Sequence, residues 1–296
     1  VKATVSSLKV RRQIELTLGS EGRSARLDGK EVRSPGLFMR SVRPVLFAPE
    51  EVGLVKGYPA GRRALLDRAI FQSDPDYLER AQLYARCLRQ RNQLLRQGRG
   101  EAEIEPWTEQ LIEAGARLRT DRLCYLKRLL PLLRETYRQI SGNREEAELH
   151  YPAAEASEAE LATALRREFE RLHQRERSFG QSLAGPHRDD PLFQVDGRPL
   201  RLYGSQGQQR SFILAFKTAQ VIDLERRLGE PPVLLLDDMT SELDRRRQGF
   251  FFRFLLQREG QVFITTTDAR TLRAEGIREA RFFRIEDGAL RPDPTE

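Results

Sequence analysis

Residues 233 to 244 read Val-Leu-Leu-Leu-Asp-Asp-Met-Thr-Ser-Glu-Leu-Asp, four apolar residues followed by two carboxylates and a polar turn. An apolar run without alternation predicts a strand covered on both faces, in the middle of a parallel sheet. Ligands of such sheets bind at the carboxyl ends of the strands, where Asp237 and Asp238 stand. We therefore expect Asp237 to hold Mg²⁺ and Asp238 to orient or deprotonate an attacking water. A carboxylate pair that only caps the next segment is the alternative.

A second motif, Ser205-Gln206-Gly207-Gln208, lies about thirty residues upstream. The apolar spacing of residues 211–227 predicts that a helix follows it and ends at Gly229. A hydroxyl, unblocked backbone N–H groups and the positive end of a helix dipole together suit a phosphate. An ordinary helix cap without a ligand is the alternative. The carboxylate pair at the end of the next strand favours the phosphate.

These two motifs resemble the signature segment, the Walker B motif and the D-loop of ABC-type ATPase heads, in the SMC-like branch that maintains chromosomes and repairs double-strand breaks. Within that branch the chain is similar to the RecF family of bacterial DNA replication and repair proteins. The similarity runs from about residue 25 to residue 270. The matching blocks are residues 45–50, 54–57, 62–67, 89–95, 183–190, 205–210, 234–238, 241–244 and 262–268.

This resemblance implies an α/β fold, an ABC-type ATPase head with a mixed sheet and flanking helices, into which a mainly α-helical arm is inserted. It divides the chain into an N-terminal part of the head (1–57), the arm (58–182) and a C-terminal part of the head (183–296). Residues 1–50 are strand-like, which predicts an antiparallel layer with a hairpin turn at Asp28-Gly29.

Helical periodicity characterises the arm. Apolar residues at helical spacing predict helices over residues 77–97 and 107–140, with glycines between and after them. A third helix, rich in Arg and Glu, is predicted over residues 158–177, and its charges are expected to form a solvated face.

The resemblance further implies a dimer in which two heads enclose ATP and Mg²⁺. By matching positions, it assigns Ser205 and Gly207 to the γ-phosphate of the partner's nucleotide, Gln208 to the ribose or phosphates, and Ser241 and Asp244 to the interface. Thr267 stands where many ABC heads place a switch histidine. Because a hydroxyl cannot replace an imidazole, we expect slow turnover and a clamp timed by ATP.

The chain departs from the family at one important point. The family opens with a phosphate-binding loop, Gly-x4-Gly-Lys-Ser/Thr, whose amides and Lys cradle the phosphates. The nearest sequence here is Asp28-Gly29-Lys30, but Ser24 replaces the first Gly and Glu31 replaces the hydroxyl residue. We therefore interpret the chain as lacking an N-terminal segment of the head, and expect it to bind ATP poorly and to be inactive by itself.

Composition agrees with a nucleic-acid partner. The formal net charge is +7 and the pI is about 9.7, and most basic residues are Arg, whose planar fork suits phosphate. A GC-rich or heat-adapted genome also encodes many arginines. Cys87 and Cys124 lack ligand spacing and indicate a reducing compartment, and no apolar run approaches the roughly 20 residues of a membrane span. We expect a cytoplasmic protein without membrane contact.

His187 has no ligand-spaced partner and is expected to be a hydrogen-bonded turn residue.

The implied role is recognition of gapped DNA or of junctions between single-stranded and duplex DNA. The ATP-dependent dimer would assist recombinase loading and the SOS response, with RecR and RecO as family partners and a weak DNA-dependent ATPase activity. No base-reading pattern identifies the residues that contact DNA. Two alternatives stay open: an ATPase-inactive DNA-binding or regulatory fragment, and a transporter ATPase subunit, which would have no reason to carry so long a helical arm.

Overall fold

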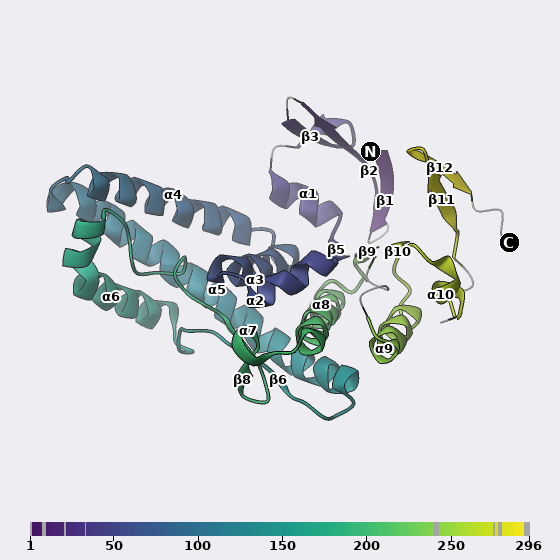
Figure 1. Cartoon of the computed structure of the whole chain (residues 1–296). Helices are drawn as coiled ribbons and strands as arrows, with labels where there is room; N and C mark the ends of the chain where they lie inside the picture. The colour runs from purple at the N-terminus through teal and green to yellow at the C-terminus, as the bar shows by residue number, and fades with distance from the viewer. Residues whose placement is uncertain are drawn as a thin grey trace.

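The computed structural model describes residues 2–7, 10–20, 22–32, 34–238, 243–274, 276–277 and 280–292. Figure 1 shows small sheets and short helices at one end of the molecule and a long helical arm that extends away from them. Mixed strands and helices around an inserted helical arm agree with the predicted α/β class.

The N-terminal strands form an antiparallel sheet. In sheet order they are β1 (Lys2–Ser7), β2 (Val10–Gly19), β3 (Gly22–Leu27) and β4 (Lys30–Glu31). Asp28 and Gly29 connect β3 to β4 with φ angles of 52° and 78°, the two positive values that a two-residue hairpin turn requires. The predicted hairpin at Asp28-Gly29 is confirmed.

The apolar run of residues 233–236 forms the central strand of a parallel sheet. β9 (Val233–Asp237) lies between β5 (Pro44–Phe47) and β10 (Val262–Thr265) and runs parallel to both. The predicted central parallel strand is confirmed. The prediction that residues 45–47 join an antiparallel layer is wrong, because β5 pairs with β9, which is distant in the sequence, and not with its neighbours in the chain.

At β9 and β5 only one face of this parallel sheet is buried, contrary to the expectation of cover on both. Leu234 and Leu236 are buried, whereas Val233 and Leu235 on the other face are half-buried. The covered face packs against helices, as Phe47 shows by placing its ring 5.0 Å from that of Phe251.

The arm consists of long helices packed side by side. They are α4 (Tyr77–Arg96), α5 (Glu101–Ser141) and α6 (Glu158–Phe179), with α3 (Pro59–Ser73) at the base. Figure 1 shows α5 between α4 and α6. The three predicted helices are confirmed. α5 begins before Pro106, earlier than predicted, because Glu101 and Glu103 favour a helix N-terminus and one Pro near that end removes few hydrogen bonds.

The remaining elements complete the head and the base of the arm. They are α1 (Pro35–Ser41), the 3-10 helix η1 (Pro49–Val52), α2 (Gly53–Lys56), β6 (Ala147–His150), β7 (Leu192–Val195), β8 (Arg198–Pro199), α7 (Leu200–Tyr203), α8 (Gln206–Leu228), α9 (Arg245–Leu256), α10 (Ala269–Ala274), β11 (Phe283–Glu286) and β12 (Ala289–Pro292). β6, β7 and β8 form an antiparallel sheet, and β11 pairs with β12. In the described ranges no helix has the length and apolar character of a membrane span.

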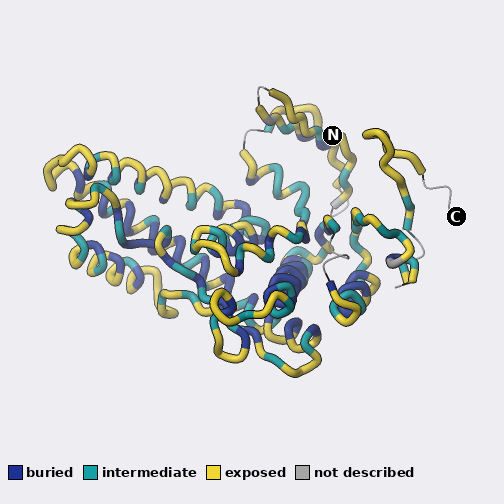
Figure 2. Tube along the Cα trace, viewed as in Figure 1, coloured by how far each residue is buried: buried dark blue, intermediate teal, exposed yellow. Residues whose placement is uncertain are grey.

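Helix α8 runs through the core between the arm and the head. Figure 2 shows it as buried along most of its length, and it packs against α5. Two charged residues of α8, Lys217 and Asp223, are buried with it. Lys217 Nζ lies 2.9 Å from Glu51 Oε1, and both of these side chains are almost fully covered. Burial lowers the pKa of Lys217. The pair fixes α8 to η1, because without Glu51 the buried Lys217 charge would lose its carboxylate, and without Lys217 the buried Glu51 would keep only Arg68, at 3.6 Å.

The loop of residues 182–190 is fastened to the arm by buried arginines of α5. Arg119 Nη2 donates to Asp189 Oδ1 at 2.8 Å, and Arg122 Nη1 donates to the Pro186 carbonyl at 2.9 Å. Both arginines are almost fully buried, so these charge-assisted bonds lie in a low-dielectric environment. The loop that returns the chain from the arm to the head is thereby held in a single position.

Candidate functional site

The two Walker B carboxylates lie at the carboxyl end of β9, as predicted. Asp237 is the last residue of β9 and pairs in register with Thr265, the last residue of β10. Thr265 Oγ1 donates to Asp237 Oδ1 at 2.6 Å, and it accepts a hydrogen bond from Asp238 N at 3.1 Å. The Thr265 hydroxyl therefore orients the Asp237 carboxylate and also holds the backbone of Asp238.

Asp238 begins a sharp turn out of the strand. Its φ angle is +42°, a value that is uncommon for residues other than Gly, Asn and Asp. The side chain of Asp238 is half-buried and that of Asp237 is exposed. Thr267, the predicted switch position, follows β10 and is also exposed, whereas the hydroxyl that contacts Asp237 belongs to Thr265.

The donor atoms at this strand end fit Mg²⁺ in one specific way. Two carboxylates and a hydroxyl are the hard oxygen ligands that Mg²⁺ prefers, and Mg²⁺ is usually held by one or two carboxylates together with phosphate oxygens and water. The described part of the chain contains no cluster of three or more His, Cys, Asp or Glu residues that could hold a metal by themselves. The site therefore suits Mg²⁺ that arrives with a phosphate ligand.

Ser205 caps the signature helix α8 through a reciprocal pair of hydrogen bonds. Ser205 Oγ accepts from Gln208 N at 3.1 Å, and Gln208 Oε1 accepts from Ser205 N at 2.9 Å. This capping box satisfies two N–H groups of the first turn and prolongs the helix to Gln206, earlier than the expected residue 211. The hydroxyl of Ser205 keeps its own hydrogen for a further acceptor. Ser205 is exposed, so a phosphate could reach it.

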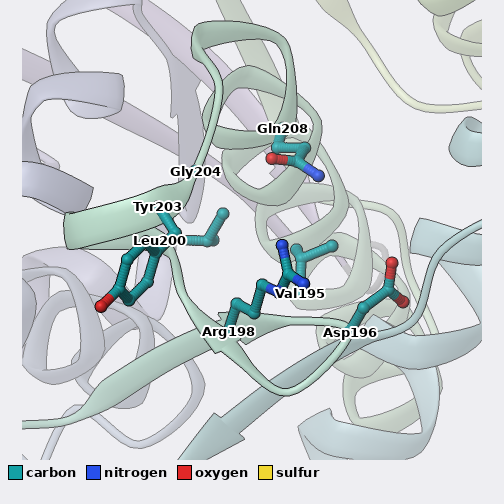
Figure 3. Close-up of a pocket in the computed structure, with 7 residues that line it drawn as sticks. All are labelled: Val195, Asp196, Arg198, Leu200, Tyr203, Gly204 and Gln208. Carbon is teal, nitrogen blue, oxygen red and sulfur yellow. The ribbon is translucent and has the colours of Figure 1, made fainter.

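Gln208 connects the signature helix to the base of the arm. Its Nε2 donates to Glu145 Oε1 at 2.9 Å, while Glu145 Oε2 accepts from the Tyr137 hydroxyl at 2.9 Å. A hollow of about 360 Å³ lies beside it, and Figure 3 shows the lining residues Val195, Asp196, Arg198, Leu200, Tyr203, Gly204 and Gln208. Contact between Gln208 and a ribose would compete with its bond to Glu145.

Arg247 of α9 joins the D-loop to the signature helix. Asp244 caps α9 by accepting from Arg247 N at 2.9 Å, and it also pairs with the Arg247 guanidinium. Arg247 Nε donates to Ser211 Oγ of α8 at 2.7 Å. A Cβ atom on Gly207 would lie 3.0 Å from Arg247 Nη2, so a side chain at that position would require the Arg247 guanidinium to shift by a few tenths of an ångström. Ser241, the other predicted D-loop residue, lies outside the described residues.

His187 is a structural residue, as expected. Its Nδ1 lies 2.6 Å from the Tyr84 hydroxyl and its Nε2 lies 3.3 Å from the Ser182 carbonyl oxygen. A neutral Tyr hydroxyl donates to Nδ1, so Nε2 carries the hydrogen and donates to the carbonyl. Burial lowers the pKa of His187 to about 4, which keeps the ring neutral at physiological pH.

Comparison with known proteins decides the family. No family model matches the chain. The DNA replication and repair protein RecF of Syntrophotalea carbinolica is 53% identical over 281 residues, which cover 95% of this chain and 77% of the relative. The RecF protein of Geobacter sulfurreducens is 47% identical over 296 residues, covering 99% of this chain and 81% of the relative. The chain belongs to the RecF family.

Solved structures agree with RecF membership. A structure described as the recombination mediator protein RecF with ATP in the RecFOR pathway has a TM-score of 0.86 at 29% identity, covering 98% of this chain and 80% of its own. An Smc head domain from Pyrococcus furiosus has a TM-score of 0.50 at 15% identity, covering 95% of this chain and 71% of its own, which bears on the fold alone. These relatives confirm the predicted ATPase-head fold and a DNA replication and repair function, and they do not favour a transporter subunit or a regulatory fragment.

Sequence reasoning missed residues around this RecF site that only tertiary contacts reveal. Thr265 on β10 contacts Asp237 on the neighbouring strand β9. Arg247 on α9 contacts Ser211 on α8, and Glu145, which follows α5, contacts Gln208 on α8. A weak signal existed for Thr265, since the last residues of neighbouring parallel strands meet at one sheet edge. No local sequence pattern marks Arg247 or Glu145.

Proposed function

We propose that this chain acts within an ATP-dependent dimeric DNA clamp that recognises gaps or junctions between single-stranded and duplex DNA. The clamp would assist recombinase loading and the SOS response together with RecR and RecO. Support comes from its relatives, which include a DNA replication and repair protein and a structure described as RecF with ATP in the RecFOR pathway. The basic net charge of +7 is consistent with a DNA partner.

The observation that carries this proposal is the coupling of two exposed segments through Arg247. Ser205 at the start of α8 and Asp244 at the start of α9 are both exposed in the single chain. Arg247 contacts Asp244 directly and holds α8 through Ser211. The signature helix and the D-loop therefore present one surface, which is what a head needs in order to act on a nucleotide held by a second copy.

Each residue then has a defined task. Asp237, oriented by Thr265, would hold Mg²⁺, and Asp238 would orient the attacking water or take its proton. Ser205 and the amide of Gly207 would donate to the γ-phosphate of the partner's nucleotide, helped by the dipole of α8. Mg²⁺ supplies neutralisation of the phosphate charge when it is bound. Gln208 would contact the ribose or phosphates, Ser241 and Asp244 would cross the interface, and Thr267 would face the γ-phosphate as a weak sensor.

The test measures dimerisation on an extended chain, in which the N-terminal phosphate-loop segment of one RecF relative precedes residue 1. We expect ATP to dimerise the extended chain in sedimentation velocity and Ser205→Arg to block this while leaving nucleotide binding by the monomer nearly unchanged. Ser157→Arg is a matched control, because Ser157 caps α6 with the same type of capping box, far from α8. Normal ATP-dependent dimers of Ser205→Arg would refute the role in trans.

A further inference from the structure

Helix α4 carries a long segment without acidic residues. Residues 80 to 100 contain six arginines and no Asp or Glu. Three of these arginines already pair with carboxylates elsewhere in the arm: Arg80, Arg91 and Arg99. The other three, Arg86, Arg89 and Arg96, are exposed, and none of them has a carboxylate partner within ion-pair distance among the described residues.

Three exposed arginines elsewhere in the arm differ in this respect. Arg117 pairs with Glu158 at 2.9 Å, Arg138 with Glu146 at 2.8 Å and Arg166 with Glu109 at 2.5 Å. Their side chains are exposed as well, but each positive charge is balanced by a neighbour. Arg167, Arg171 and Arg175 of α6 are also exposed and have no carboxylate within ion-pair distance among the described residues, but Glu168 and Glu170 lie among them in the sequence. Residues 80–100 differ because they contain no acidic residue at all, so their excess positive charge goes beyond the Arg-rich composition of the whole chain.

The unpaired arginines lie on one face of α4. At about 100° per residue, Arg86, Arg89 and Arg96 fall within an arc of about 80°; Gln82 and Gln93 share this arc, and Gln97, which follows the last residue of α4, lies about 20° beyond its edge. We call this set the α4 basic face: Gln82, Arg86, Arg89, Gln93, Arg96 and Gln97. The opposite face packs against the arm through Tyr84, Cys87 and Leu95. Figure 2 shows the outward side of α4 as exposed.

A shallow hollow lies within this face. It has a volume of about 500 Å³ and is lined by Arg89, Gln93, Arg96 and Gln97, all of which are hydrogen-bond donors. From Arg86 to Arg96 the helix rises about 15 Å, the length over which one strand of duplex DNA presents about four phosphates. The spacing and the donors therefore match a phosphate backbone.

The chemistry of the face favours duplex DNA over two other occupants. Protein interfaces have an apolar centre, and the α4 basic face contains no large apolar side chain. Single-stranded nucleic acid is usually held by aromatic stacking, and the face contains no aromatic residue. Interfaces with duplex DNA are polar and positively charged, with Arg and Gln donating to phosphate and sugar oxygens.

We propose that the α4 basic face binds the phosphate backbone of duplex DNA. The inference rests on the DNA-binding part of the proposed function and places a DNA contact surface on the arm. It requires no nucleotide, since the arginines lie on a rigid arm helix. The face contributes affinity and orientation but no base readout, because phosphate contacts are independent of sequence.

The test compares two triple variants of the chain by fluorescence anisotropy with a duplex of about 30 base pairs, in KCl from about 50 to 300 mM. One variant is Arg86→Gln, Arg89→Gln, Arg96→Gln. The matched control is Arg117→Gln, Arg138→Gln, Arg166→Gln. It also removes three positive charges from the formal net charge of +7, but from arginines that are paired with carboxylates. Gln is a good helix former, so both variants should keep the fold, and circular dichroism checks this.

Loss of three phosphate contacts should make the slope of log K against log salt less negative by about 2.7, since each contact contributes about 0.9. The α4 variant should bind at least about tenfold more weakly at low salt, and the control should keep the wild-type slope. Equal slopes for the α4 variant and the control would overturn the inference while leaving the proposed function intact. Absence of any duplex binding by the wild-type chain would overturn both.

Discussion

Acidification should destabilise the protein through one buried histidine, His187. Its imidazole is held neutral, with Nδ1 accepting from Tyr84 and Nε2 donating to the Ser182 carbonyl. Burial is the largest cause that lowers its pKa, and the charges of Arg188 and Arg63 act in the same direction. The Ser182 carbonyl and Asp189 act in the opposite direction without restoring the ordinary value. Protonation therefore costs more in the folded state than in the unfolded chain.

The magnitude follows from the pKa in the two states. The pKa of His187 is about 4 when folded, against 6.5 ordinarily, and each unit corresponds to about 1.4 kcal/mol, so the full contribution is about 3 kcal/mol. Between these two values the unfolded state binds more protons, so the free energy of unfolding falls as the pH falls. The contribution is fully present above pH 6.5 and is lost by about pH 4.

The assay is urea unfolding at about pH 7.5 and pH 4.5 for the wild type and for His187→Gln, whose side chain does not titrate. The wild type should lose about 2.5 kcal/mol more between the two pH values than the variant does. His150→Gln is the control, since His150 is an exposed histidine on β6, and it should behave as the wild type. The same pH dependence in the wild type and in His187→Gln would refute the argument.

Three further predictions concern the site and the core. In the extended chain, Asp238→Asn should lower ATP hydrolysis at least about 100-fold while ATP binding and dimerisation remain, and wild-type turnover would rule out Asp238 as the base. Arg247→Ala should raise the ATP concentration needed for dimerisation about tenfold without unfolding the chain, because the link between Asp244 and α8 is lost; an unchanged ATP dependence in sedimentation would contradict this. Lys217→Met should lower the free energy of unfolding by about 3 kcal/mol, because the buried Glu51 carboxylate would keep only the exposed Arg68, at 3.6 Å, as an ion-pair partner, and Glu51→Gln in the same chain should recover part of that loss in urea unfolding.

The local patterns of this chain predicted what depends on neighbours in sequence. The apolar run before Asp237 predicted a central parallel strand, and Asp28-Gly29 predicted a hairpin. Both could be predicted because a buried strand and a turn with positive φ angles each depend on a few consecutive residues. Residues 77–97 likewise predicted α4 from apolar spacing alone. The carboxylates and the signature residues could be named in advance for the same reason.

Contacts between distant segments were decided only by the tertiary structure. Thr265 lies opposite Asp237 because β10 pairs with β9 in one particular register, which no local pattern specifies. β5 joins that sheet rather than the N-terminal one, and β9 is buried on only one of its faces. Arg247 could not be distinguished from its Arg neighbours until α9 was seen beside α8. Side chains such as these acquire a role through packing, and packing joins residues far apart in the chain.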